Sequence, residues 1–221
     1  MDQTASSVGG AVAIDFADPA KPQVRSVAVD LTALGYALCI IDSGASHADL
    51  TGEYAAVPQE MRAVAAFFGK EVLREVSERQ VLDQLPALRA QVGDRAVLRA
   101  LHFFADDARV EGEADALARK DMDAFLALVK ESGRSSWELL QNITPAGAVA
   151  EQAMAVALTV ARRALRGRGA CRVHGGGFAG TIQAFVPLDI LDAFRAETEG
   201  ALGAGSCHVL SLRPVGGAVL C

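Results

Sequence analysis

Apolar and polar residues follow one another with different periods in successive parts of the chain. Over about the first 45 residues they alternate as they do in β-strands, which predicts strands at 10–16, 24–30 and 36–42. Proline and glycine residues typical of turns lie between these stretches. The N-terminal part is therefore expected to form a meander of antiparallel strands.

In the middle of the chain the apolar residues recur with a helical period. One helix is expected at 54–68, where Gly69 then ends it. Another is expected to begin at Ser77, because its spacing from Gln80 matches a capping box. Pro86 either kinks or ends this second helix.

Three further helices are expected before the pattern changes again. A long one covers 94–120, and the next begins at Asp121 and is interrupted at Gly133. Pro145 is expected near the start of the last one, because a proline's missing N–H is harmless in a first turn. Basic residues before Gly167 suit the negative end of that helix.

Short elements return near the C-terminus. Strands are expected at 170–174, 181–186, 207–212 and 218–221, with a helix at 189–200. The expected order is strands, then helices, then strands and a further helix, with no repeated β-α-β unit. This order predicts an α+β fold in which antiparallel sheet packs against a helical layer. No repeat or linker divides the sequence, so one unit over 1–221 is expected.

The composition is that of a globular protein, with 51% hydrophobic and 22% charged residues. A formal net charge of −6 disfavours nucleic acid and anionic membranes as partners, since both need clustered basic residues. No apolar run approaches the roughly 20 residues that span a bilayer, and no secretory signal is recognisable. The four cysteines form neither a CxxC pair nor a zinc-finger spacing, so no metal site is expected. They fit buried or terminal thiols in a reducing, cytoplasmic setting.

Residues 171–181, CRVHGGGFAGT, place three consecutive glycines directly after an expected strand. Glycine costs roughly 0.5–1 kcal/mol relative to alanine in regular structure. The cluster therefore indicates either a tight turn or a backbone that lies close to a ligand. It matches neither a phosphate loop ending in Gly-Lys-Ser/Thr nor a dinucleotide fingerprint. Spacing alone favours a structural turn, although consecutive N–H groups can also form a nest for anionic oxygen.

The sequence contains RVHGGGFAG at 172–180, Met1-Asp2-Gln3, and Asp42-Ser43-Gly44 followed by Glu53-Tyr54. These three stretches resemble the galactokinases and, more widely, the GHMP superfamily of sugar and metabolite kinases. The residues RVHGGGFAG at 172–180 resemble the third conserved motif of these kinases. Met1-Asp2-Gln3 resembles the segment whose aspartate is the proposed catalytic base. Asp42-Ser43-Gly44, followed by Glu53-Tyr54, resembles the segment whose tyrosine lies at the sugar site. The stretches occur in the family's order, and the resemblance covers the chain from end to end.

The resemblance implies the fold of a GHMP kinase C-terminal domain and gives individual residues a role. Asp2 is implied to be the catalytic base that accepts the proton of the sugar hydroxyl. Tyr54 is implied to border the sugar, with its ring packed against it. Gly175, Gly176 and Gly177 are implied to line the active-site cleft near the phosphates.

Three positions near these motifs need separate treatment. His174 stands where the family usually has threonine, and Ala179 where it usually has glycine. These departures affect the detail of the loop, and His174 could add a donor near phosphate. His47 is either a sugar contact or a solvent-facing loop residue, and we favour the second alternative.

The family's N-terminal motifs, Gly-Glu-His-x-Asp and Pro-x-Gly-x-Gly-Leu-Ser-Ser-Ser, do not occur in the sequence. The resemblance is thus to the C-terminal half of a galactokinase. It implies that residues 1–45 correspond to the inter-lobe region, that residues 46–221 form the C-terminal domain, and that the N-terminal lobe is absent. The implied cofactors are ATP and Mg²⁺, most of whose ligands would lie in that lobe.

The implied reaction is transfer of the ATP γ-phosphoryl group to the anomeric hydroxyl of galactose. The implied partners are galactose or a close sugar relative, the N-terminal kinase lobe, and a second copy of the chain through the exposed inter-lobe face. We expect the chain alone to be inactive as a kinase. The alternatives are a sugar-binding or sensor domain without catalysis, and a structural dimerisation module.

Overall fold

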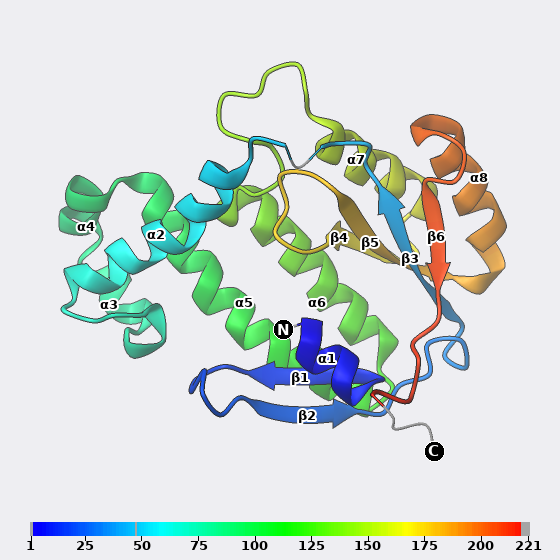
Figure 1. Ribbon diagram of the computed structural model, residues 1–221, viewed down its shortest axis with the longest axis horizontal. Helices are drawn as coiled ribbons and strands as arrows, with labels where there is room; N and C mark the ends of the chain where they lie inside the picture. Colours follow the sequence, from blue (N-terminus) through cyan, green and yellow to red (C-terminus); the bar gives the residue numbers. More distant parts are fainter. Residues whose placement is uncertain (1, 47, 218–221) are drawn as a thin grey trace.

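The computed structural model describes residues 2–46 and 48–217. At its centre is a four-stranded antiparallel sheet in the order β4-β5-β3-β6, and a separate two-stranded sheet is formed by β1 and β2 (Figure 1). The strands are β1 (Ala11–Asp15), β2 (Gln23–Val27), β3 (Tyr36–Asp42), β4 (Ala170–Val173), β5 (Thr181–Pro187) and β6 (Cys207–Leu210). The α-helices are α1 (Asp2–Val8), α2 (Thr51–Phe67), α3 (Glu78–Asp83), α4 (Leu85–Val92), α5 (Asp94–Ala118), α6 (Met122–Ser135), α7 (Ala153–Leu165) and α8 (Leu191–Leu202). Shorter helical segments are η1 (Leu73–Glu75), the π-helix η2 (Ser136–Leu140) and η3 (Leu188–Ile190). Within the described ranges, no helix has both the length and the apolar character needed to cross a membrane.

The central sheet is the middle layer of a three-layer arrangement. One face packs against α7 and α8, in a core that includes the fully buried Ile41, Ile182 and Phe194. The other face packs against α6, where the rings of Phe125 and Phe185 meet edge to face with centroids 4.9 Å apart. Burial on both faces explains why β5 is apolar at nearly every position rather than at alternate ones.

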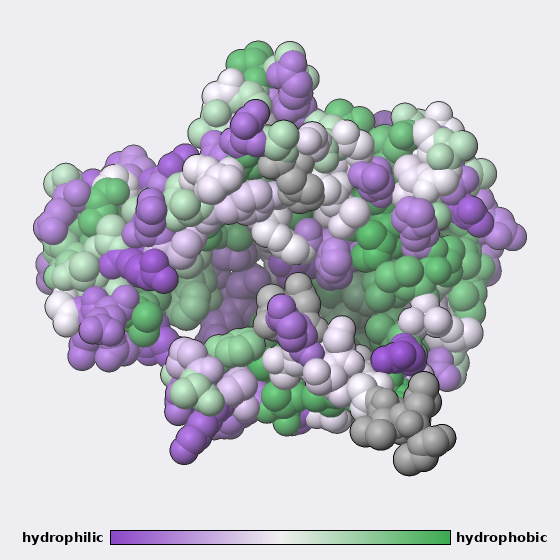
Figure 2. Space-filling view, viewed as in Figure 1, coloured by the Kyte–Doolittle hydropathy of each residue, from purple (hydrophilic) through white to green (hydrophobic). Residues whose placement is uncertain are grey.

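A second core lies among the helices α2 to α5, shown at the left of Figure 1. The β1-β2 hairpin is joined to this helical part by exposed ion pairs, Arg25 with Glu111 (2.7 Å) and Arg74 with Asp15 (2.8 Å). Between the hairpin and α2, η1 and α5 lies a cavity of about 650 Å³, and Figure 2 shows the surface hollowed above the hairpin. Ion pairs to α5 and η1 therefore connect the hairpin to the helical part across this cavity.

The α+β class with antiparallel sheets is confirmed, as are several local predictions. Ser77 and Gln80 form the expected capping box at the start of α3. Gly69 follows α2 with a φ of 69°, and the Asp121 side chain caps α6. Pro86 ends one helix rather than kinking it, since α3 stops before it and α4 begins with it in the first turn.

The expected meander is wrong in its third strand. Strands β1 and β2 pair antiparallel, but β3 lies in the other sheet, between β5 and β6. Cys39 and Ile41 of β3 are completely buried in the core that α7 and α8 cover. The partners of β3 come from far along the chain, so sequence proximity pointed to the wrong sheet.

The interruption expected at Gly133 is also wrong, because α6 continues through this residue to Ser135. A Cβ at Gly133 would lie 3.0 Å from Arg172 Cβ and 3.2 Å from the Cys171 carbonyl oxygen. Helix α6 lies so close to β4 that glycine is needed for packing and not for a break.

The last helix of the middle region starts later than expected. Pro145 lies in a loop, and α7 begins only at Ala153. The Ala146 N–H donates to the Glu53 carboxylate (2.7 Å), and the Ala148 N–H donates to the Pro145 carbonyl (3.1 Å). These bonds fold the loop back onto the start of α2.

The cysteines agree with the sequence analysis where they are described. Cys39, Cys171 and Cys207 are buried free thiols. Cys221 and the strand expected at 218–221 lie outside the described residues.

Candidate functional site

The triple-glycine stretch forms a bend between the antiparallel strands β4 and β5. The His174 N–H donates to the Thr181 carbonyl (3.1 Å), which closes the base of the bend. Gly175 and Gly177 have φ values of 73° and 82°, in the left-handed region that glycine enters without steric cost. We call residues 174–180 the glycine bend.

Phe178 gives the glycine bend an unusual conformation. It is 3% exposed and has a φ of 61°, which is uncommon for a large side chain. The Ala179 N–H donates to the Gly177 carbonyl (2.7 Å), so Phe178 is the centre of a γ-turn. Such a conformation costs about 1–3 kcal/mol and persists only where surrounding contacts enforce it.

Tyr54 supplies one of those contacts. It lies in the first turn of α2, and its hydroxyl donates to the Gly177 carbonyl at 2.9 Å. Its ring meets Phe178 edge to face, with centroids 5.6 Å apart. A Cβ at Gly176 would lie 3.0 Å from the Tyr54 ring, so the ring covers the backbone of the bend directly. Partial burial raises the pKa of Tyr54, which keeps the hydroxyl protonated as a donor.

The stretch Asp42-Ser43-Gly44, which also resembles a galactokinase segment, touches the glycine bend. Both the Ser43 hydroxyl (2.6 Å) and the Ser43 N–H (2.9 Å) donate to the Gly180 carbonyl. The Gly180 N–H in turn donates to the Ala45 carbonyl (3.4 Å). The structure thus brings 42–45 and the start of α2, which are close in sequence, into contact with the bend, which lies more than 100 positions later.

Asn142 is a residue of this site that the sequence analysis missed. Its backbone carbonyl accepts the Phe178 N–H (2.6 Å), and its side-chain amide donates to the Gly176 carbonyl (3.1 Å). A Cβ at Gly177 would lie only 2.1 Å from the Asn142 carbonyl oxygen. Asn142 is 3% exposed, and its Oδ1 accepts no hydrogen bond from the described residues. One asparagine after a helix carries no sequence signal that could have identified it.

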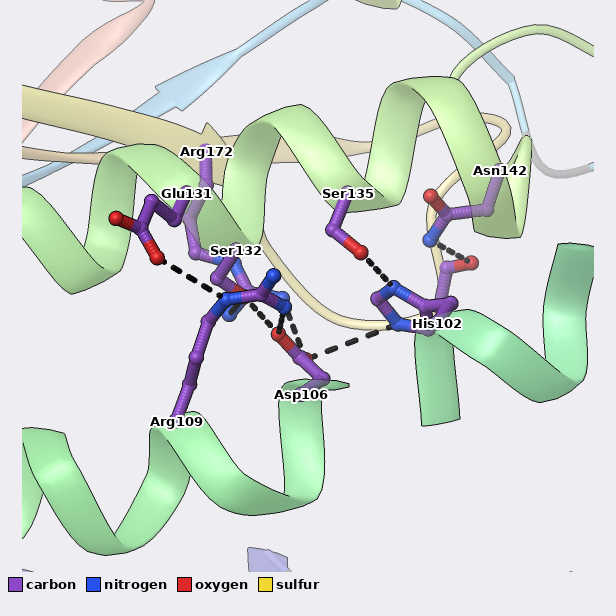
Figure 3. A network of polar contacts seen from close by, with 9 residues as sticks. His102, Asp106, Arg109, Glu131, Ser132, Ser135, Asn142 and Arg172 are labelled. Carbon is purple, nitrogen blue, oxygen red and sulfur yellow. Dashed lines mark hydrogen bonds and ion pairs between the residues drawn. The ribbon is translucent and has the colours of Figure 1, made fainter. Parts of the chain in front are cut away.

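A partly buried polar network supports the strand that leads into the bend (Figure 3). Arg172 of β4 donates to the Ser132 hydroxyl (2.5 Å), and that hydroxyl donates to Asp106 of α5 (2.5 Å). His102 bonds to the Ser135 hydroxyl (2.8 Å), and burial lowers the pKa of this imidazole. The network joins α5, α6 and β4 and fixes the start of the bend relative to the helices.

The other residues singled out from the sequence are only partly described. Asp2 is the first residue of α1, and its side chain lies outside the described part of the structure. The end of α1 is held by the Gly217 N–H, which donates to the Ser7 carbonyl (3.0 Å). His47 lies outside the described residues. His174 bonds to the Thr181 hydroxyl (3.1 Å) at the base of the bend.

The glycine bend carries three successive backbone N–H groups whose hydrogen-bonding capacity is unused by the described part of the chain. Among the described residues, no acceptor takes the N–H groups of Gly175, Gly176 or Gly177. Successive free N–H groups in a turn with alternating φ can hold an anionic oxygen. No group of three or more His, Cys, Asp or Glu residues that could hold a metal occurs within the described ranges.

Comparison with known proteins supports the resemblance read from the sequence. The chain is 31% identical over 197 residues to a galactokinase of Glaesserella parasuis serovar 5, a match that covers 88% of this chain and 48% of that protein. It is 30% identical over 159 residues to a galactokinase of Haemophilus influenzae strain Rd, covering 72% of this chain and 39% of that protein. No family model matches the chain.

Two solved structures share the fold. The Lactococcus lactis galactokinase complexed with galactose aligns with a TM-score of 0.69 and 21% identity, over 93% of this chain and 51% of that one. The L. major mevalonate kinase in complex with R-mevalonate aligns with a TM-score of 0.56 and 14% identity, over 98% of this chain and 53% of that one. The chain spans about half the length of the curated relatives it matches. It is therefore a homologue of part of the galactokinases, with the α+β fold of the GHMP kinases.

Proposed function

We propose that the chain is the C-terminal half of a galactokinase-type sugar kinase and forms one wall of its active site. The proposed reaction is transfer of the ATP γ-phosphoryl group to the anomeric hydroxyl of galactose. The observation that carries the proposal is the hydrogen bond from Tyr54 to the Gly177 carbonyl, across 123 positions of sequence. It joins two stretches that separately resemble the sugar site and the phosphate-proximal loop of the family.

Each residue of the site has a definite part in this proposal. The free N–H groups of Gly175, Gly176 and Gly177 would bind phosphate oxygens, and Tyr54 would position the sugar beside them. Positioning of this kind provides much of the rate enhancement in phosphoryl transfer. Asp2 would accept the proton of the attacking hydroxyl.

The remaining parts of the catalytic machinery would come from a second lobe. Homology points to ATP and Mg²⁺ as cofactors, and the N-terminal kinase lobe would supply most of their ligands. We therefore propose that the chain by itself does not turn over ATP. The three free buried thiols fit the reducing conditions of the cytoplasm, where we place the protein.

Galactose-dependent ADP release tests the proposal directly. The chain is assayed alone and together with the part of the Glaesserella galactokinase that lies outside the match, roughly half of that protein. We expect turnover only in the mixture. The idea of a missing lobe fails if the chain alone works at the rate of an intact galactokinase. If the two halves copurify but the complex is inactive, they do not form a shared active site. If they do not associate, this chain does not bind the second lobe as proposed.

Tyrosine substitutions in the active mixture then test the sugar site. Tyr54→Phe removes one hydrogen bond to the bend, worth about 1 kcal/mol, and we expect the KM for galactose to rise about fivefold with a smaller change for ATP. Tyr36→Phe is the control, because Tyr36 is the chain's other tyrosine and lies on β3 away from the bend. Equal effects of both substitutions would contradict the role given to Tyr54.

A further inference from the structure

A second cavity, separate from the glycine bend, lies at the start of β4. It has a volume of about 620 Å³ and is bounded by α6, η2, α7 and β4. Its inner wall includes the buried Cys171 and the partly buried Trp137, and its rim carries the exposed side chains of Lys130, Arg134 and Arg162. Its volume lies in the range of small-molecule sites, and its lining combines apolar and charged side chains.

The rim is positively charged although the chain as a whole is acidic. Glu138 is the single carboxylate that lines the cavity beside the three cations. Within the described ranges, neither Arg134 nor Arg162 forms an ion pair with any carboxylate. Lys130 makes only a long hydrogen bond, to the Gly167 carbonyl (3.4 Å). The charge on the rim is therefore not neutralised by the protein.

Nearby arginines that do not line this cavity behave differently. Arg166 pairs with Glu197, and Arg168 pairs with Asp189 (2.7 Å). The protein thus has carboxylates available for arginines in this region, but they are not directed at the cavity.

Arg162 is held in place by groups that leave its charge intact. Its guanidinium carbon lies 5.2 Å from the centroid of the Trp137 ring, a cation–π contact that orients the group without neutralising it. Burial raises the pKa of the neighbouring Cys171 thiol to about 11, although the Arg162 charge lowers it, so the thiol is uncharged at neutral pH and does not neutralise Arg162. The guanidinium is therefore pre-positioned and available to an anion.

Helix dipoles explain part of this arrangement. Arg134 and Arg162 lie in the last turns of α6 and α7, where a cation stabilises the helix by about 0.3–1 kcal/mol. Arg163 obtains the same benefit one position further along without lining the cavity. The dipole therefore accounts for cations at these helix ends, but not for their convergence with Lys130 on one cavity.

We propose that this cavity binds a small organic phosphate, with its phosphate held by Arg134, Arg162 and Lys130 and its organic part against Trp137. Guanidinium groups suit this ligand because their N–H donors match the oxygens of a phosphate in pairs. The site lies where β4 begins, whereas the glycine bend follows the end of the same strand. It is thus a binding site additional to the proposed active site.

The chain's single tryptophan makes the proposal easy to test, because Trp137 lines the cavity. Inorganic pyrophosphate serves as the probe and is titrated at constant ionic strength, with sodium chloride as the compensating salt. We expect a saturable change in Trp137 fluorescence and a saturable rise in melting temperature. A change that is linear in pyrophosphate, or one that sodium chloride reproduces, would show general ionic screening and overturn the proposal.

Matched arginine variants locate the binding. Arg134→Gln is the main variant, because this exposed side chain makes no hydrogen bond or ion pair among the described residues. Arg162→Gln is followed by melting temperature, since it also changes the surroundings of Trp137. Arg163→Gln is the control from the same helical turn. We expect at least about fivefold weaker pyrophosphate binding in the first two variants and unchanged binding in the control. If pyrophosphate binding weakened equally in all three variants, this cavity would not be the binding site.

Discussion

Replacing Gly177 by alanine tests whether the glycine bend is held by the contacts that the structure shows. The residue has a φ of 82°, and an added Cβ would lie 2.1 Å from the Asn142 carbonyl oxygen. Ordinary contact begins at 3.4 Å, so the bend or the Asn142 backbone must move by roughly an ångström. Gly175 offers a matched control, because its φ is 73° and an added Cβ would meet nothing within 4 Å.

The size of the effect follows from these contacts. Alanine in the left-handed region costs about 1–2 kcal/mol relative to glycine, and this applies to both variants. Movement at Gly177 also disturbs the bonds from the Phe178 N–H to Asn142 (2.6 Å) and from Tyr54 to Gly177 (2.9 Å). Each is worth about 1 kcal/mol, so Gly177→Ala is expected to lose about 3–4 kcal/mol of unfolding free energy and Gly175→Ala about 1–2.

Urea unfolding, followed by circular dichroism and by Trp137 fluorescence, measures both losses. We expect the Gly177 variant to unfold at clearly lower urea than the Gly175 variant. If the two losses agree within about 0.5 kcal/mol, the close approach of Asn142 to the bend is not a feature of the folded protein in solution.

Two other predictions concern buried charge. Burial raises the pKa of Glu113 from its usual 4.5 to about 7. Between pH 4.5 and 7, the Glu113 carboxyl is therefore protonated in the folded protein but ionised in the unfolded chain. The free energy of unfolding should therefore fall as the pH rises from about 4.5 to 7. The stability of Glu113→Gln relative to the wild type should be greater at about pH 8 than at about pH 5. A stability difference that is the same at both pH values would contradict this prediction. Arg99 is completely buried and bonds to Glu60 (2.9 Å), so Glu60→Gln should cost about 3–5 kcal/mol in urea unfolding, since it leaves a buried charge unpaired. Asp83→Asn, which removes an exposed pair with Arg79, should cost less than about 0.5 kcal/mol, and similar losses in both variants would refute the argument.

Features that depend on neighbouring residues were predictable from the sequence. The bounds of β3 match the apolar stretch that predicted a strand at 36–42. Gly69 ends α2, and the capping box at Ser77 begins α3. In each case the residues that specify the feature lie within a few positions of it, so the local pattern was sufficient.

The candidate site was predictable only in part. Tyr54 and Gly175 to Gly177 were selected from their sequence motifs, but the motifs do not show that these residues touch. Asn142, which fixes the bend from a third segment, was missed because a single polar residue has no periodicity. The loop that carries it was expected to become helical from Pro145, but its N–H groups bond back to α2 and to the loop itself.

The sequence by itself thus determined the α+β class, the positions of most helices and strands, and the need for glycine in the bend at 174–180. The tertiary structure decided that β3 joins β5 and β6 and that Gly133 serves packing instead of a break. It also decided that Tyr54 lies on the glycine bend. The reason is physical: periodicity and caps record what each residue needs from its immediate neighbours and from water. Which distant surface covers a buried face depends on the packing of the whole chain, and a local pattern does not specify that partner.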